Sequence, residues 1–289
     1  MEKIRIVSPA KQIAPKLLEE ASDFLKKRGF EVEIAPHAGG EHNYFSGTIE
    51  ERLSDFQAAL DDSELDIILC ARGGYGSVQL IDHLDFSKFV KRPKLIVGYS
   101  DITVFHNHIH ANHNLPTVHA TAPLNFAENT TEALESLINV FNGVSNAYDV
   151  LKHELNIQGE VEGILVGGNL AILYGLIGTN SDIDYTGKIL FIEDVGEAIY
   201  ALDRMFYALK KSGKLDQISG LIVGGLTAMK DSEKPFGKTA EEVIHDHIKN
   251  LGIPVCYNFP AGHIDDNRAL LLGKKAKLVV NTDSTKFYQ

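Results

Sequence analysis

The sequence is poor in residues that build disulfide or metal frameworks. Its two cysteines, Cys70 and Cys256, lie far apart and form no CxxC pair. Zinc knuckles and disulfide-stapled folds are therefore not indicated, and a reduced, cytoplasmic setting is expected. The first residues, MEKIRIVSPAKQ, carry charges at Glu2 and Lys3 and only a short apolar run, too short for a signal peptide.

Basic residues are also scarce. Lysine and arginine number 28 against 39 aspartate and glutamate, which gives a formal net charge of -11, and no block rich in lysine and arginine is present. Such a chain has no electrostatic footprint for a polyanion. Nucleic acid and an anionic membrane surface are therefore not expected as partners.

Long apolar runs are missing, with one exception. Residues 163–181 contain no charged side chain and approach the length that crosses a bilayer. Glycines together with Asn169, Thr179 and Asn180 argue against a membrane span. A buried strand, a glycine turn and a buried helix describe this run better.

The first half of the chain alternates short β-branched runs with helical patterns, which is typical of a parallel sheet covered by helices. The run 65–71 is apolar enough to be a central strand buried on both faces. The strands expected in this half lie at 4–8, 31–35, 65–71 and 94–98.

The pattern weakens between about residues 142 and 159 and then resumes. We therefore expect two domains, an N-terminal α/β domain over 1–145 and a C-terminal domain over 160–289. In the second half, strands are expected near 161–166, 188–192, 219–225 and 276–280, and helices near 169–177 and after Glu197.

A possible nucleophile lies in GYSD at 98–101. A serine on a tight strand-to-helix turn exposes its Oγ beside backbone N–H groups without partners. Ser100 also fits a simple helix N-cap, and Ile102 stands where the G-x-S-x-G elbow of α/β-hydrolases has its second glycine. The motif alone leaves both interpretations open.

A glycine-rich segment, ARGGYGS at 71–77, follows the expected central strand. Its glycines allow positive φ and let backbone N–H groups point at an anion, either a phosphate or a tetrahedral oxyanion. The segment lacks the ending of a P-loop and the full G-x-G-x-x-G spacing, so nucleotide binding is the lesser interpretation. A plain glycine-rich turn remains comparable.

Twelve histidines compete for the role of a catalytic base. Several gather between residues 106 and 119, where His106 and His110 could share a helix face and hold a metal. No HExxH motif or carboxylate set accompanies them, so solvated helix histidines are the preferred explanation and no metal is predicted. His263 differs, because it lies in the polar loop PAGHIDDN, and catalytic side chains tend to lie on such loops.

A catalytic histidine needs a carboxylate that holds one ring tautomer and stabilises the imidazolium. Glu193 is the best candidate, because it follows the apolar strand 188–192 at its C-terminal edge. Asp194 and Glu197 compete with it, although acids at the start of a helix, favoured by the macrodipole, explain these two better.

A set of segments stands in order along nearly the whole chain: IRIVSPA, RGGYGS, KLIVGYSDIT, GGNL followed by LIGT, ILFIEDVGE, ALDRM, and AGH followed by LLLG. Together they resemble the LD-carboxypeptidase family of serine peptidases, which also includes the microcin C immunity hydrolases. The resemblance implies an α/β fold, with an N-terminal parallel-sheet domain similar to class I glutamine amidotransferases and a C-terminal mixed α/β domain.

The resemblance also implies roles for individual residues. Ser100 matches the nucleophile, Glu193 the orienting acid and His263 the general base. The oxyanion donors would be the backbone N–H groups of Gly74 and Asp101. A homodimer without metal or other cofactor is implied as well.

The implied reaction is hydrolysis of the amide between an L-centre and a terminal D-amino acid, as in release of D-alanine from murein tetrapeptide during peptidoglycan recycling. The small peptide substrate carries a free carboxylate, which a positive side chain should meet. Arg72 and Arg204 are the candidates for this contact.

Two features depart from the family. Many members read HGP after the nucleophile helix, where this chain reads HATAP at 119–123. The chain also has no tryptophan, whereas the immunity hydrolases are expected to stack one on a nucleotide base, so a microcin C-type peptidyl-nucleotide is the second choice of substrate. A non-catalytic protein that holds an anion at RGGYG and at the helix start is the alternative from another class.

Overall fold

The structure, a computed structural model, describes residues 2–289. Its strands are β1 (Lys3–Val7), β2 (Glu31–Ile34), β3 (Ile67–Cys70), β4 (Leu95–Gly98), β5 (Thr117–His119), β6 (Ala147–Leu151), β7 (Gly159–Asn169), β8 (Ile189–Val195), β9 (Gly220–Thr227), β10 (Val255–Cys256), β11 (Leu270–Leu272), β12 (Lys275–Val280) and β13 (Ser284–Tyr288). Its α-helices are α1 (Pro15–Lys26), α2 (Ile49–Asp61), α3 (Ser87–Lys91), α4 (Thr103–His113), α5 (Thr131–Phe141), α6 (Leu170–Leu176), α7 (Ile199–Lys211) and α8 (Ala240–Ile248).

The first sheet has the strand order β11-β5-β4-β3-β1-β2. Strands β1 to β5 run parallel, and β11 pairs antiparallel with β5 at the edge. Every residue of β3 is buried, because helices cover both faces of a parallel sheet. The predicted N-terminal parallel sheet is confirmed, and the C-terminal part of the chain adds the strand β11 to it.

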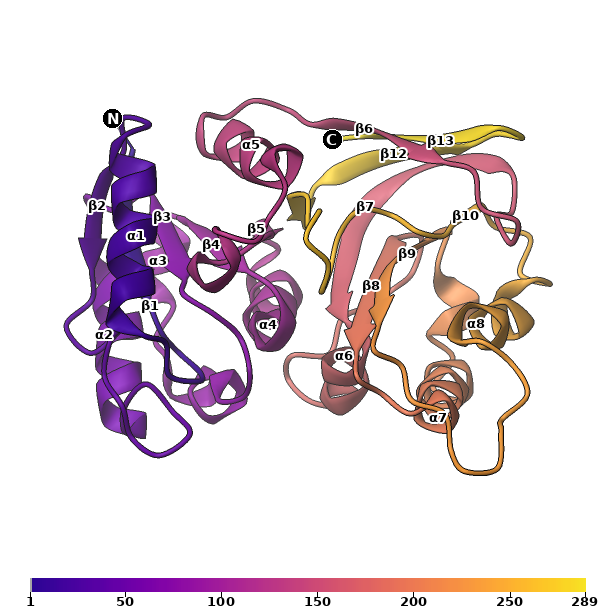
Figure 1. The fold of residues 1–289 in the computed structure, drawn as a ribbon, viewed down its shortest axis with the longest axis horizontal. Helices are drawn as coiled ribbons and strands as arrows, with labels where there is room; N and C mark the ends of the chain where they lie inside the picture. Colours follow the sequence, from indigo (N-terminus) through magenta and orange to yellow (C-terminus); the bar gives the residue numbers. More distant parts are fainter. Residues whose placement is uncertain (1) are drawn as a thin grey trace.

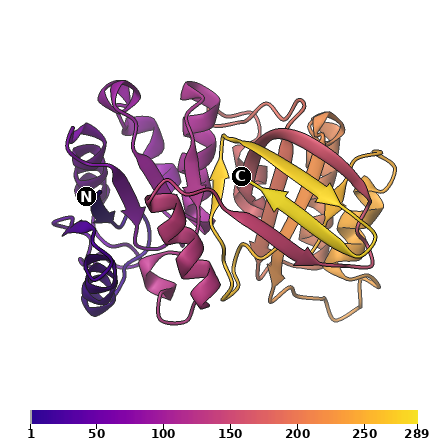
Figure 2. The same cartoon turned by 90° about the horizontal axis from the view of Figure 1, so that it is seen from above.

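The second sheet has the order β10-β9-β8-β7-β12-β13-β6 and is mixed. Strands β7 to β10 run parallel, whereas β12, β13 and β6 are joined antiparallel. Strand β6 lies where the sequence pattern weakens. Neither β6 nor β13 was predicted from the sequence. Figure 2 shows β12 and β13, in yellow, side by side over the C-terminal half.

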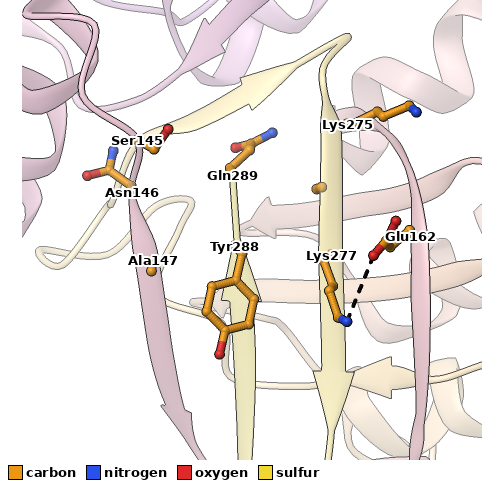
Figure 3. Close-up of a pocket in the computed structure, with 9 residues that line it drawn as sticks. Ser145, Asn146, Ala147, Glu162, Lys275, Lys277, Tyr288 and Gln289 are labelled. Atoms are coloured by element: carbon orange, nitrogen blue, oxygen red, sulfur yellow. Dashed lines mark ion pairs between the residues drawn. The ribbon is translucent and has the colours of Figure 1, made fainter.

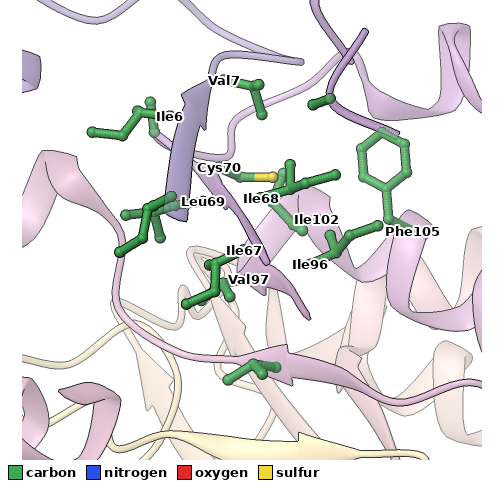
Figure 4. Packing of buried hydrophobic residues seen from close by; sticks show 14 of the residues in the cluster. Ile6, Val7, Ile67, Ile68, Leu69, Cys70, Ile96, Val97, Ile102 and Phe105 are labelled. Carbon is green, nitrogen blue, oxygen red and sulfur yellow. The ribbon is translucent and has the colours of Figure 1, made fainter. Parts of the chain in front are cut away.

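Helix α4 lies between the two sheets (Figure 1), where it packs against β7 and α6. Its start is anchored in the first core, in which Ile102 and Phe105 pack beside apolar side chains of β1, β3 and β4 (Figure 4). The ring of Phe105 also stacks on that of Phe56 from α2. The start of α4 is therefore packed in the first core, while the helix also contacts β7 and α6 of the second half.

The apolar run 163–181 forms the end of β7, the helix α6 and the turn after it. The predicted strand and helix are both present, but the predicted glycine turn between them is not, because Gly167 and Gly168 belong to β7 and α6 follows directly. Over residues 2–289, no helix has both the length and the apolar character that a bilayer crossing requires.

We expect Leu69→Ala to lower the free energy of unfolding by about 2–5 kcal/mol, because Leu69 is fully buried in β3 and its truncation leaves a cavity. Leu151→Ala is the control, because Leu151 is 87% exposed and its truncation should change stability by less than about 0.5 kcal/mol. Urea unfolding followed by circular dichroism measures both. Equal effects of the two substitutions would contradict the assigned core.

Candidate active site

Ser100 lies on the turn between β4 and α4, in a short 3-10 turn over Ser100–Ile102. Its φ of +64° is uncommon for a residue other than glycine. A β-carbon at Gly98 would lie 2.9 Å from Ile102 Cγ1 and 3.1 Å from Cys70 Cβ. Gly98 thus makes room for Ile102, which explains why this turn needs no second glycine. Strained backbone of this kind clusters at functional sites.

The glycine-rich loop 71–77 lies directly against this turn. A β-carbon at Gly73 would lie 2.8 Å from Ser100 Cβ and 3.1 Å from the backbone nitrogen of Asp101. Gly74 follows with φ of +120°. No backbone carbonyl in residues 2–289 accepts a hydrogen bond from the N–H of Gly74 or Asp101. Both N–H groups lie on segments that border Ser100.

Two buried charged side chains, the Asp101 carboxylate and the Arg52 guanidinium, hydrogen-bond to the backbone of this loop. Asp101 Oδ2 accepts a hydrogen bond from Ser77 N at 2.8 Å, and burial raises the pKa of Asp101. Arg52 Nη1 donates to Pro9 O at 2.8 Å and to Gly76 O at 3.4 Å. The role of Arg52 was missed in the sequence. Its only signal is a charged residue on the buried face of α2.

Glu193 and His263 form a close pair. Nδ1 of His263 lies 2.6 Å from Oε2 of Glu193, whose side chain is fully buried in β8. Burial lowers the pKa of His263, but the hydrogen bond and the charge of Glu193 outweigh this effect, so the pKa is raised above its usual value. A β-carbon at Gly262, which has φ of +114°, would lie 2.7 Å from Glu193 Cβ. Only a glycine before His263 permits this approach.

A bulge in β9 makes room for the loop that carries His263. Between β8 and β9 the register shifts opposite Glu193, where Gly224 and Gly225 stand across from one residue. Gly225 N donates to Ala261 O at 2.9 Å, and a β-carbon at Gly224 would lie 2.3 Å from that oxygen. The two glycines ending SGLIVGG carried this signal, but the sequence pattern indicated only a strand.

The turn that carries Ser100 contacts the imidazole of His263 through Tyr99, the residue before Ser100. The ring centroids of Tyr99 and His263 are 4.9 Å apart in a T-shaped arrangement. The Tyr99 hydroxyl donates to Asn125 Oδ1 at 2.7 Å, which fixes the ring. Within residues 2–289, no hydrogen bond joins Ser100 Oγ to His263. Catalytic hydrogen bonds are often long without substrate and tighten in the complex.

The two competing acids have other contacts. Asp194 Oδ1 accepts from Asn169 Nδ2 at 2.9 Å, and its Oδ2 accepts from Ala171 N at 3.0 Å. Asp194 therefore acts at a helix N-terminus, as the sequence suggested, but the helix is α6. Burial and the charge of Glu193 raise the pKa of Asp194 to about 6. The backbone oxygen of Glu197, which lies just before α7, accepts from Lys230 N.

The two candidate arginines lie in different surroundings. Arg72 is half-buried, donates to Gln12 O at 3.1 Å and to Gly73 O at 3.3 Å, and lines a cavity of about 460 Å³ together with Lys11. Arg204 is exposed on α7, over the ring of Tyr200. Arg72 is thus adjacent to the glycine that abuts Ser100.

The expectation that the clustered histidines are solvated is wrong for three of them, whereas His108 and His113 are partly exposed. His106, His110 and His119 are buried, because α4 and β5 are covered by the second half of the chain. His106 Nε2 lies 2.9 Å from Gly98 O, and burial lowers its pKa to about 4. Within residues 2–289, no three histidine, cysteine, aspartate or glutamate side chains are grouped so that they could hold a metal ion.

Another pocket lies on the antiparallel part of the second sheet (Figure 3). Lys277, Glu162 and Tyr288 line it, and Lys277 Nζ is 3.8 Å from Glu162 Oε1. None of the residues predicted for catalysis lies in it.

Comparison with known proteins places both halves of the chain. The LD-carboxypeptidase N-terminal domain matches residues 4–120, and the LD-carboxypeptidase C-terminal domain matches residues 162–278. A probable murein peptide carboxypeptidase of Bacillus subtilis is 34% identical over 95% of this chain and 88% of its own length. The microcin C7 self-immunity protein of Escherichia coli is 27% identical over 96% of this chain and 89% of its own.

A solved structure agrees with these relatives. The crystal structure of muramoyltetrapeptide carboxypeptidase from Oxalobacter formigenes superposes with a TM-score of 0.90. It is 29% identical, and the match covers 99% of this chain and 98% of that one.

We expect Glu193→Gln to lower the pKa of His263 below its usual value, because burial remains while the negative charge is lost. NMR titration of the imidazole Cε1–H signals, with His263→Ala to assign the peak, measures this change. Asp216→Asn, at an exposed position, is the control and should leave the pKa unchanged. A pKa that stays the same or rises in the Glu193 variant would show that the carboxylate does not charge-stabilise this ring.

Proposed function

The chain belongs to the LD-carboxypeptidase family, and on this premise we propose that it is a serine carboxypeptidase that cleaves the amide between an L-centre and a terminal D-amino acid. The substrate that we propose is a murein tetrapeptide, from which D-alanine would be released. The observation that carries the proposal is Ser100, held at φ of +64° directly after Tyr99, whose ring packs against an imidazole that is paired with a buried carboxylate. Relatives named as murein peptide and muramoyltetrapeptide carboxypeptidases support this substrate class.

In the proposed mechanism, His263 Nε2 takes the proton of Ser100 while Oγ attacks the scissile carbonyl carbon. The tetrahedral oxyanion accepts hydrogen bonds from the backbone N–H groups of Gly74 and Asp101. The imidazolium then protonates the leaving amine, and water hydrolyses the acyl-enzyme by the same route. Glu193 keeps the proton on Nδ1 and stabilises the imidazolium, which the short bond and the raised pKa of His263 support.

The free carboxylate of the substrate needs a cation, and Arg72 and Arg204 stay the proposed partners. The place of Arg72 beside Gly73 favours it, because that glycine borders Ser100. We also propose a division into domains over 1–145 and 160–289, a homodimer and a cytoplasmic location. The separate matches over 4–120 and 162–278 support the division.

A peptidyl-nucleotide of the microcin C type is the alternative substrate, supported by the similarity to the microcin C7 self-immunity protein. The absence of tryptophan weighs against stacking on a nucleotide base. A substrate panel with a murein tetrapeptide and a peptidyl-nucleotide separates the two. Anion binding without acylation would instead favour a non-catalytic protein.

Ser100→Ala should lower kcat for D-alanine release by about 10⁴ to 10⁶-fold while the fold persists, because the acyl-enzyme can no longer form. Released D-alanine is measured by chromatography, and labelling by a fluorophosphonate is followed by mass spectrometry of the intact protein. Ser77→Ala, a serine of the neighbouring loop, is a control that should still be labelled. Activity that survives in the Ser100 variant would exclude this nucleophile.

Arg72→Met should raise KM for the tetrapeptide more than Arg204→Met, because Arg72 lies beside Gly73 and Arg204 is exposed on α7. The loss of one charge-assisted hydrogen bond predicts a rise of about 10-fold or more. A tetrapeptide with an amidated C-terminus provides the matched control, because it should be insensitive to the substitution. Unchanged KM in both variants would eliminate both arginines.

A further inference from the structure

The proposed catalytic groups come from different sheets. Ser100 follows β4 of the first sheet, whereas Glu193 belongs to β8 of the second. Proton transfer requires that the serine and the histidine are aligned, and a misplacement of about 1 Å can cost about 10²-fold in rate. The contacts that fix α4 against β7 therefore matter for the reaction, although they touch no substrate.

One such contact is made by Thr103, the first residue of α4. Its side chain is fully buried, and its Oγ1 accepts a hydrogen bond from Asn169 N at 3.0 Å. A β-carbon at Gly168 would lie 2.5 Å from the same oxygen. The end of β7 thus packs so closely against the start of α4, just after Ser100, that only a glycine fits at position 168.

The contact continues through buried polar groups to the proposed acid. Asn169 caps α6, because its Oδ1 accepts from Ile172 N, and its Nδ2 donates to Asp194 Oδ1. Asp194 also accepts from Ala171 N and directly follows Glu193 in β8. Thr103, Asn169 and Asp194 are each at most 5% exposed. Such buried networks restrict geometry strongly, because every partner that moves leaves a polar group unsatisfied.

We propose that Thr103, Asn169 and Asp194 form a clamp that sets the alignment of Ser100 with His263. The three are positioning residues, and the inference rests on the proposed serine mechanism. Removing the Thr103 hydroxyl frees the N–H of Asn169 and loosens α4 against β7, which moves the nucleophile but leaves the pair of Glu193 and His263 intact.

Thr103→Val tests the clamp, because valine keeps the shape and removes the acceptor. We expect kcat for D-alanine release and the rate of fluorophosphonate labelling each to fall about 10- to 100-fold, with KM within about 2-fold of native. The acid limb of the pH profile should stay in place, because the surroundings of His263 do not change. Thr103→Ser should restore activity.

The matched control is Thr285→Val. Thr285, in β13 of the second sheet, is also fully buried, and its Oγ1 accepts a hydrogen bond from Nδ2 of Asn156 at 3.5 Å. This variant should lose similar thermal stability and keep kcat. An equal loss of kcat in the two variants at the same folded fraction would overturn the clamp. Should Thr103→Val not fold, Thr103→Ala takes its place, and native kcat in that variant would refute the proposal.

The two proposals fail in distinguishable ways. A Ser100→Ala variant that retains activity, or a native protein that neither releases D-alanine nor reacts with the fluorophosphonate, overturns the proposed function and the clamp with it. An inactive Ser100→Ala variant beside a Thr103→Val variant of native kcat overturns the clamp alone.

Discussion

The bond between Glu193 and His263 is the interaction on which the arrangement of the site depends. A carboxylate with no exposed surface is costly to bury unless it is paired, and Glu193 has its imidazole partner at 2.6 Å. The pair can form because Gly262 has no side chain to collide with Glu193. The glycines of β9 likewise leave room for the loop before His263 to pack against that strand. Three glycines thus make room for one hydrogen-bonded pair.

Glycines also make room for the turn at Ser100, which follows β4 of the first sheet. Positive φ at Ser100 costs free energy, of the order of 1–3 kcal/mol, and persists only where the surroundings determine it. Here the missing side chains of Gly98 and Gly73 let Ile102 and the neighbouring loop pack against the turn. Asp101 adds a buried hydrogen bond to Ser77, so the strained turn and the glycine-rich loop hold each other.

Local pattern made part of this architecture predictable. Strands β1 to β4, the helix after Glu197 and the turn at Ser100 follow from runs of neighbouring residues, and the structure contains them. The burial of His106 and His110 was not predictable in this way, because α4 is covered by β7 and α6 from far along the chain. The pairing of β6 with β13 is likewise non-local, and neither strand has a strong pattern of its own.

The segment that carries His263 connects the two sheets. Strand β10 pairs with β9 in the second sheet, and β11 pairs with β5 in the first, so the segment that carries His263 runs from one sheet to the other. Ser100 is fixed in the first sheet and Glu193 in the second, while the imidazole is tethered to both. A displacement of one half against the other must therefore strain the loop at His263 before it can separate the hydroxyl from the carboxylate. The stiffness of this loop, with Gly262 N bound to Asn267 Oδ1 and Thr227 Oγ1 bound to His263 O, then limits how far the two halves can drift apart.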